Sequence, residues 1–384
     1  MNITFLVGNG FDIAAGIDTS YRAFYKWYCD QKSDKEHVNK FKNEIKEDIK
    51  NGGNNWADFE IGLGQYTSHF TVDNVSEFLD CYEDAHNMII QFLEDQKSKF
   101  SIEDISQEET EMFKNGLVNF YQDLNPQEIN TFNNIINSDK DYDSTINFVS
   151  FNYTNTLNKI VEKVSKTNLK QWLTRGSTRK MTVNNKIISM HGTSTEYPIL
   201  GVDNASQISN QDLLSVPNFS DIMIKPQSVN AIGQLWHSEA RSIISRSKIV
   251  CVFGMSLGES DATWWSAIIK WLKDDSTRHL IVFWYTPNPP NRISVLRKLE
   301  ETKKAKDALY KHYKLSANDL ASIESRIHIA INTQNVLNLH LNKIKTNEEA
   351  KNADDYIVFD GGEIGSDQSS FVNFDGVGKE IVVV

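Results

Sequence analysis

Short apolar segments that end in glycine or polar residues are the feature that most constrains the fold of this 384-residue chain. The first segment, 3–7, runs into Gly8-Asn9-Gly10, and a helix is predicted to follow over 11–15. A strand, a glycine turn and a helix in this order are typical of the start of a parallel α/β sheet. Runs of this kind suit strands buried on both faces, and we predict further strands at 145–151, 186–190, 248–253, 279–285 and 327–331.

Helical segments separate these strands, and a long helical region interrupts the first strand–helix unit. Helices are predicted at 157–164, 233–247 and 262–272, with another charged helical stretch at 291–320. The region 21–140 is charged and poor in strands, and its residues Ala85, Met88, Ile89, Phe92 and Leu93 repeat at the spacing of one helix face.

The fold class predicted from this pattern is α/β, with a Rossmann-like parallel sheet. We expect residues 1–20 and 141–335 to form the α/β domain and 21–140 to form a helical insertion. Residues 336–384 are expected to form a helical and acidic C-terminal extension. The last 34 residues carry two lysines against seven acidic residues, a net charge of −5. This pattern favours a loosely ordered acidic tail, although alternating apolar residues such as Tyr356, Val358 and Phe371 leave room for a β-hairpin or an edge strand.

Charge and cysteine content exclude several classes of protein. The balance of 40 Lys+Arg against 51 Asp+Glu gives a net charge of −11, so we do not expect a nucleic-acid partner, which needs a positive surface. The three cysteines are far apart, which argues against a disulfide framework and a four-cysteine zinc site and fits a reducing cytosol. No apolar run approaches the length of a membrane span. We expect a cytoplasmic protein with no membrane partner and no metal.

Four segments follow predicted strands, so we expect them at the carboxyl edge of the sheet, where open α/β sheets bind ligands. A glycine turn before a helix offers N–H groups to a phosphate, and an asparagine can hydrogen-bond a sugar or a water. A histidine that leaves a strand is well placed as a general base. The candidate residues are Gly8, Asn9, Gly10, Phe11 and Asp12 in the first segment, Asn152 in the second, His191 in the third, and Gly254, Ser256 and Leu257 in the fourth.

Each segment also has a purely structural interpretation. The G-x-G-x-x-G pattern is incomplete because Ile13 stands at its third glycine position, so the turn could bind nothing and Asp12 could be a helix-start carboxylate. Asn152 could cap the helix that follows it, and Asp261 could cap the helix at 262–272. His237 is expected to be a packed or surface helical residue.

The order of the four segments resembles the sirtuin-like NAD-binding fold. Gly8-Asn9-Gly10 with 16–18 is similar to the sirtuin glycine turn, 151–153 to the segment that carries its asparagine, His191-Gly192 to its His-Gly, and 254–257 to its Gly-Thr-Ser-Leu. More closely, the chain resembles the bacteriophage abortive-infection AbiH family over residues ~6–265. The phrases that carry this resemblance are LVGNGFDIAAGIDTSY, WADFE, SFNYTNTL, HGTSTEYPILGVDN and GMSLGESDATWW.

The resemblance implies an antiphage abortive-infection protein that hydrolyses NAD at the nicotinamide–ribose bond and depletes cellular NAD. Asn152 would then hold the ribose or the attacking water, and His191 would be the general base. The glycine turn and the segment at 254–257 would hold the phosphates and the adenosine. Sirtuins carry a four-cysteine zinc module between their His-Gly and Gly-Thr-Ser segments, whereas this interval contains only Cys251. Deacylation of lysine is therefore not expected.

Two other functions remain open: a non-catalytic sensor or scaffold that binds NAD or ADP-ribose, and an ADP-ribosyl transferase. An unregulated NAD hydrolase would harm its host, so we expect a gate, such as a phage-derived activator, homo-oligomerisation or another defence-system partner. Glu60, in the phrase WADFE, could reach the site, but a surface or core-capping role is an equal alternative.

Overall fold

The computed structural model describes residues 1–53, 56, 58–103, 105–139, 143–173, 176–289 and 294–344, and the strands β8 (Asn373–Phe374) and β9 (Glu380–Ile381). Residues Met1–Lys343 form one compact unit and Ile344–Val384 form a second. In the second unit, β8 and β9 pair in antiparallel fashion. The tail residues Tyr356, Val358 and Phe371, on which the hairpin alternative rested, lie outside the described residues.

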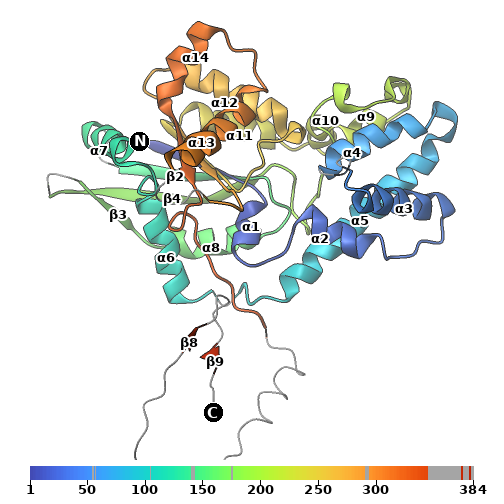
Figure 1. Ribbon diagram of the computed structural model, residues 1–384, viewed down its shortest axis with the longest axis horizontal. Helices are drawn as coiled ribbons and strands as arrows, with labels where there is room; N and C mark the ends of the chain where they lie inside the picture. Colours follow the sequence, from blue (N-terminus) through green and yellow to red (C-terminus); the bar gives the residue numbers. More distant parts are fainter. Residues whose placement is uncertain are drawn as a thin grey trace, which may run out of the picture. The chain divides into compact units, whose positions relative to one another are not determined.

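A seven-stranded sheet forms the centre of the first unit (Figure 1). The strand order is β3-β4-β2-β1-β5-β6-β7, and all pairs are parallel except β3 with β4. The strands are β1 (Asn2–Val7), β2 (Asp143–Ser150), β3 (Leu169–Trp172), β4 (Thr178–Ser189), β5 (Ile249–Phe253), β6 (His279–Trp284) and β7 (Ile327–Ile331). The mixed α/β fold and the six predicted strands are confirmed.

The antiparallel edge strand β3 and the first half of β4 were not predicted. In β4, buried and exposed residues alternate over 178–184, and β3 shows the same alternation. That pattern belongs to a strand with one face exposed, whereas the prediction relied on continuous apolar runs. The prediction therefore found only the central strands and the buried end of β4.

Helices cover both faces of the sheet (Figure 1). On one face, α1 (Gly10–Ala14), α6 (Gln107–Val118), α7 (Pro126–Ser138) and α8 (Thr156–Ser165) share a core with Phe5 and Phe148. On the other face, α11 (Trp236–Ser245), α12 (Ala262–Asp274), α13 (Val295–Tyr310) and α14 (Ala317–Ile323) share a core with Leu6 and Val149. Neighbouring residues of one strand thus pack into opposite layers, because side chains alternate across a strand.

Five further helices build a core of their own. They are α2 (Tyr21–Tyr28), α3 (Glu36–Lys50), α4 (Phe59–Tyr66), α5 (Val75–Ser98) and α9 (Phe219–Met223), and α10 (Lys225–Ala231) follows α9 in the chain. The aromatic residues Phe24, Phe41 and Phe59 lie at its centre together with Val202 and Phe219. The helices between β1 and β2 therefore divide between the core shared with Phe5 and this helical core. A segment before β5, which includes α9, joins the helical core.

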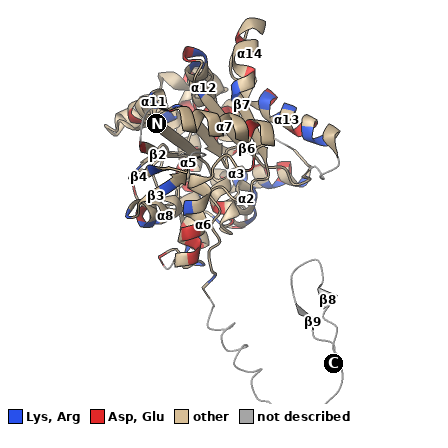
Figure 2. Cartoon of the chain, turned by 90° about the vertical axis from the view of Figure 1, so that its left-hand side faces the viewer, with Lys and Arg blue, Asp and Glu red and all other residues tan. Residues whose placement is uncertain are grey.

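Charge is unevenly distributed over the first unit (Figure 2). The helix α13 carries a basic stretch that includes the exposed residues Arg297, Lys298, Lys303 and Lys304. The net charge of −11 is thus compatible with a local basic surface. Among the described residues, no helix is both long and apolar enough to cross a membrane.

Candidate functional site

Four neighbouring strands end at the same level of the sheet. Val7 lies opposite Ser150 and Phe253, and Ser150 lies opposite Ser189. The segments that follow β1, β2, β4 and β5 therefore meet at one edge, as predicted. From β1 the order continues to β2 on one side and to β5 on the other, and such a switch point is where open α/β sheets bind ligands.

The glycine turn after β1 packs directly against the turn after β5. Gly8 N–H donates to the Phe253 carbonyl at 2.9 Å, Gly10 N–H to the Gly254 carbonyl at 2.8 Å, and Phe11 N–H to the Gly8 carbonyl at 3.0 Å. A Cβ on Gly10 would lie 2.6 Å from the Gly254 Cα, so only glycine fits there. These three N–H groups already have partners within the protein, and a phosphate role for this turn stays a prediction.

Other predicted ligand-binding residues differ in exposure. The Asn9 amide donates to the Thr19 carbonyl at 2.9 Å and accepts from the Thr19 hydroxyl, which ties the turn to the start of the helical region. Phe11 and Leu257 are buried in the two cores of the sheet, whereas Ser256 is exposed. Of these side chains, Phe11 and Leu257 contribute to packing in the structure as it stands.

Asp12 and Asn152, which follow the carboxyl ends of β1 and β2, form a buried polar pair. The Asp12 side chain is fully buried, and its Oδ2 accepts from Asn152 Nδ2 at 3.0 Å and from Thr154 Oγ1 at 2.6 Å. The Oδ1 atoms of Asp12 and Asn152 are also buried and have no hydrogen-bond partner among the described residues. Two acceptors of this kind are costly to bury, and such groups call for a donor from water or a ligand.

The capping alternative for Asn152 is wrong, whereas the placement of Asp12 as a helix-start carboxylate is confirmed. No side chain caps the N-terminus of α8, and the Asn152 amide binds Asp12 instead. Asp12 lies in the first turn of α1 but is held by donors from the β2 side. Burial raises the pKa of Asp12 to about 6, although the neighbouring side chains of Thr154, Thr156 and Asn152 oppose this shift.

A second cluster of charged side chains surrounds His191. Lys225 Nζ lies 2.7 Å from Glu60 Oε2 and 3.2 Å from Asp261 Oδ1. His191 Nε2 lies 3.4 Å from the same Asp261 oxygen, and the Tyr153 hydroxyl donates to Glu60 Oε1 at 3.1 Å. The cluster thus joins α4, α10, the short 3₁₀ helix η5 (Glu259–Asp261) and the segments after β2 and β4.

Local geometry places His191 within this cluster. Gly192 follows with φ of +69°, and a Cβ there would lie 2.0 Å from the Tyr197 carbonyl oxygen, so the turn after His191 requires glycine. The rings of Phe151 and Tyr153 lie 5.6 and 5.7 Å from the imidazole ring. His191 is therefore held between two aromatic side chains and one carboxylate.

One lysine, Lys225, pairs with two carboxylates, the buried Glu60 and the partly buried Asp261. Burial raises the pKa of Glu60, and the nearby charge of Asp261 adds to this effect against the attraction of Lys225. Burial acts in the same direction on Asp261, but Lys225 and His191 outweigh it and hold the pKa of Asp261 well below its usual value. Burial would lower the pKa of Lys225, yet Asp261 and Glu60 keep it raised. Lys225 is thus a fixed cation.

Sequence reasoning missed the roles of Lys225 and Asp261. Asp261 is the N-cap residue of α12, as the capping alternative placed it, but its side chain makes no capping hydrogen bond there and belongs to the ionic cluster instead. Glu60 is 3% exposed and belongs to the same cluster. Lys225 carries no sequence signal, because its partners are distant in the chain. The available signal for Asp261 was the polar sequence at 258–261, Gly-Glu-Ser-Asp, which follows a strand.

His237 lies close to the same cluster. Its ring stacks on Trp264 with centroids 5.7 Å apart, and its Nδ1 is buried without a hydrogen-bond partner among the described residues. Burial lowers the pKa of His237 to about 4, and its electrostatic interactions with His191 and Arg241 add to the shift. His237 is a packed helical residue, as predicted, and is neutral at physiological pH.

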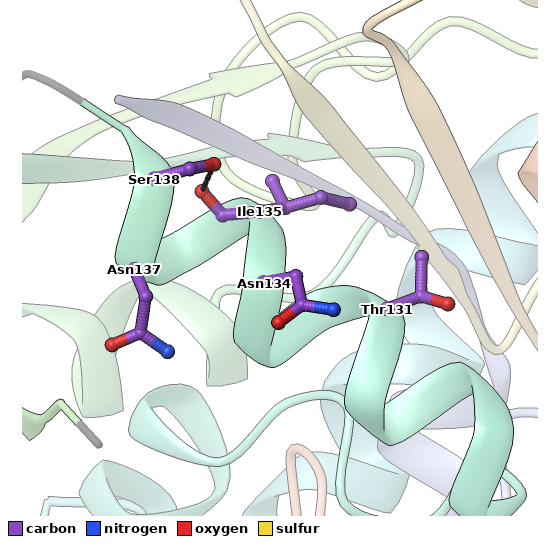
Figure 3. A pocket seen from close by; sticks show the side chains of 5 residues that line it. All are labelled: Thr131, Asn134, Ile135, Asn137 and Ser138. Atoms are coloured by element: carbon purple, nitrogen blue, oxygen red, sulfur yellow. Dashed lines mark hydrogen bonds between the residues drawn. The ribbon is translucent and has the colours of Figure 1, made fainter.

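A separate hollow of about 480 Å³ lies along α7 (Figure 3). All of its lining residues come from one helix, and none of them is charged; they are Thr131, Asn134, Ile135, Asn137 and Ser138. None belongs to the two polar clusters. In the described parts of the chain, no group of three or more His, Cys, Asp or Glu side chains is arranged to hold a metal ion.

Comparison with known proteins identifies the family. Among curated proteins the chain has no match. The family model described as bacteriophage abortive infection AbiH matches residues 4–283, which is well over half of the chain and includes Asp12, Asn152, His191 and Asp261. The chain belongs to the bacteriophage abortive infection AbiH family.

Proposed function

We propose that this AbiH-family protein acts in abortive infection by hydrolysing NAD at the nicotinamide–ribose bond. The observation that carries the proposal is the buried Asp12–Asn152 pair, whose two Oδ1 atoms have no donor among the described residues. It lies at the same sheet edge as His191, which is backed by Asp261. An amide, a carboxylate and an imidazole at a switch point are the groups that a ribose-directed hydrolase needs.

The sheet topology supports a Rossmann-like nucleotide-binding core. When only the parallel strands are counted in chain order, β4-β2-β1-β5-β6-β7 becomes 3-2-1-4-5-6. That is the order of doubly wound sheets, which bind dinucleotides across the crevice at the switch point. The proposed NAD site lies at this crevice, over the ends of β1, β2 and β5.

The chemistry of NAD hydrolysis is simple enough for these residues. Cleavage of the nicotinamide–ribose bond passes through an oxocarbenium-like state, as in glycoside hydrolysis. Nicotinamide leaves as a neutral molecule, so the reaction needs no acid for the leaving group. One group must position a water and one must accept its proton. Asn152 fits the first role, and the resemblance assigns the second to His191.

The decisive experiment measures NAD turnover. Purified protein, alone and with extract from phage-infected cells, is incubated with NAD, and nicotinamide and ADP-ribose are separated by chromatography. We expect His191→Ala and Asn152→Ala to lower the rate by about 10²- to 10⁴-fold, while Thr131→Val, in the hollow on α7, retains it. NAD is also measured in infected cells that express each form. Unchanged NAD in both settings would rule the proposal out.

A nucleotide sensor without turnover is the second candidate. The observation that favours it is the strand order β4-β2-β1-β5-β6-β7, because this order is typical of sheets that bind dinucleotides and by itself requires no catalysis. Calorimetry with NAD and ADP-ribose separates the two functions. Binding with no product in the presence of the infected-cell extract supports the sensor, and product formation supports the hydrolase. Labelled NAD that becomes attached to protein would instead indicate an ADP-ribosyl transferase.

A further inference from the structure

We infer that Asp12, rather than His191, is the base that takes the proton from the hydrolytic water, and that Asn152 holds the same water. This inference rests on the proposed NAD hydrolysis and names the catalytic residue within it. It departs from the resemblance, which implies a histidine base, and it comes from the hydrogen bonds of the two buried side chains.

The hydrogen-bond pattern leaves one acceptor free on each residue. Asp12 Oδ2 receives both Asn152 Nδ2 and Thr154 Oγ1, which fixes the orientation of the carboxylate. Asp12 Oδ1 and Asn152 Oδ1 remain without donors among the described residues, and both atoms are shielded from solvent. A water molecule has two hydrogens to donate, and buried waters typically satisfy groups of this kind. The pair is therefore suited to hold a water away from bulk solvent.

His191 is less suited to accept a proton. Its Nε2 faces Asp261 Oδ1 at 3.4 Å, and this carboxylate is held ionised by Lys225 at 3.2 Å. A nitrogen that faces an ionised carboxylate carries a hydrogen rather than a free lone pair. The ring is also packed between Phe151 and Tyr153. The contact with Asp261 and the packing of the two aromatic rings hold His191 in one orientation.

The electrostatic surroundings keep Asp12 suitable as a base near neutral pH. Burial raises its pKa to about 6, and the groups that face it are Asn152, Thr154 and Thr156 from the β2–α8 segment and, more distantly, Lys97 near the end of α5. All four oppose the effect of burial. Above pH 6 the carboxylate is mostly ionised and still a stronger base than an ordinary aspartate.

The step balances without any other reactant. The water loses a proton to Asp12 Oδ1 while its oxygen forms a bond to C1′ of the ribose. The C1′–nitrogen bond breaks, and its electron pair returns to the nicotinamide ring, which leaves neutral. Asp12 then releases the proton to solvent. The products are ADP-ribose, nicotinamide and one proton, and NAD and water are the only reactants that the step consumes.

The test is the pH dependence of kcat/KM in Thr154→Val. Wild-type kcat/KM should rise with pH and level off above about pH 6. The Thr154 hydroxyl donates to the ionised carboxylate, so its removal raises the pKa of Asp12 and moves this rise to higher pH by about one unit. Thr131→Val, on α7 and away from both polar clusters, is the matched control and should leave the profile unchanged.

Two further variants decide between the two bases. Asp12→Asn keeps the shape of the side chain and should lower turnover by about 10²- to 10⁴-fold while thermal melting shows it folded. Asp261→Asn removes the carboxylate beside His191 and should leave unchanged the pH at which kcat/KM rises. If Asp261→Asn shifts the pH at which kcat/KM rises and Thr154→Val does not, His191 is the base and our inference is wrong. Activated wild-type protein that releases no nicotinamide would overturn the proposed function, and the Asp12 assignment with it.

Discussion

Two acidic clusters, largely buried, lie at the same edge of the sheet and differ in how their charge is balanced. Glu60 and Asp261 share the ammonium group of Lys225. Asp12 is held by uncharged donors, and no ion pair to it is found among the described residues. The first arrangement fixes geometry, because each carboxylate is tied to a cation. The second leaves a carboxylate whose pKa is raised toward neutral pH, which suits proton transfer.

Removal of the cation should have the largest effect on stability. Lys225→Met leaves the buried Glu60 and the partly buried Asp261 without the lysine counter-charge, so the free energy of unfolding should fall by about 3–5 kcal/mol at pH 7.5. Urea denaturation followed by tryptophan fluorescence measures this. Addition of Glu60→Gln to Lys225→Met should restore part of the loss. A Lys225→Met protein as stable as wild type would show that the cluster is not held by this charge.

Replacing the Asp12 carboxylate by a neutral group should change the free energy of unfolding by a smaller amount, and should raise it. Folding raises the pKa of Asp12 from 3.8 to about 6. Between these values the folded protein binds more protons than the unfolded chain, so its stability falls as pH rises through this window. Asp12→Asn removes this fall and should stabilise the protein by about 3 kcal/mol at pH 7.5, with little difference at pH 3.5.

Unfolding curves from pH 3.5 to 8 measure this prediction. The variant that is expected to lose turnover is thus expected to gain stability, as is common for residues kept for function. Equal stability of wild type and Asp12→Asn across the whole range would show that burial does not penalise the Asp12 carboxylate.

The smallest effect is expected for an ion pair outside both clusters. Lys186 and Glu239 lie 2.8 Å apart, but their side chains are 64% and 37% exposed. Lys186→Met should change the free energy of unfolding by less than about 1 kcal/mol. It is the matched control for Lys225→Met, since both replace one lysine of an ion pair by methionine. A large loss in Lys186→Met would mean that the effect of Lys225→Met reports general surface charge rather than burial.

The sequence was sufficient to predict the central strands and the sheet edge that carries the candidate site. Continuous apolar runs mark strands such as β1 and β5, and each of these runs ends directly before a glycine. Since the ends of parallel strands meet, the positions of Asp12, Asn152 and His191 behind their strands were enough to assign all three to one edge. The edge strand β3 alternates instead and was missed.

Contacts between distant residues could not be predicted in the same way. Glu60 and Lys225 are 165 positions apart, and Asp12 and Asn152 are 140 apart. A local pattern can show that Asp261 follows a strand, but a helix-cap position and an ion-pair position look the same in the sequence. The difference depends on where α4 and α10 pack, which their own apolar residues decide.

The close approach of Gly10 to Gly254 has a mechanical consequence. Two backbones in direct contact, joined by the hydrogen bonds of Gly8 and Gly10, cannot slide or separate without breaking both bonds. The turns after β1 and β5 are therefore expected to move together as a single rigid body. On the β2 side the sheet edge is joined to the helical core through a side chain instead, because the Tyr153 hydroxyl lies 3.1 Å from Glu60 Oε1 and 2.7 Å from the Ile199 carbonyl oxygen.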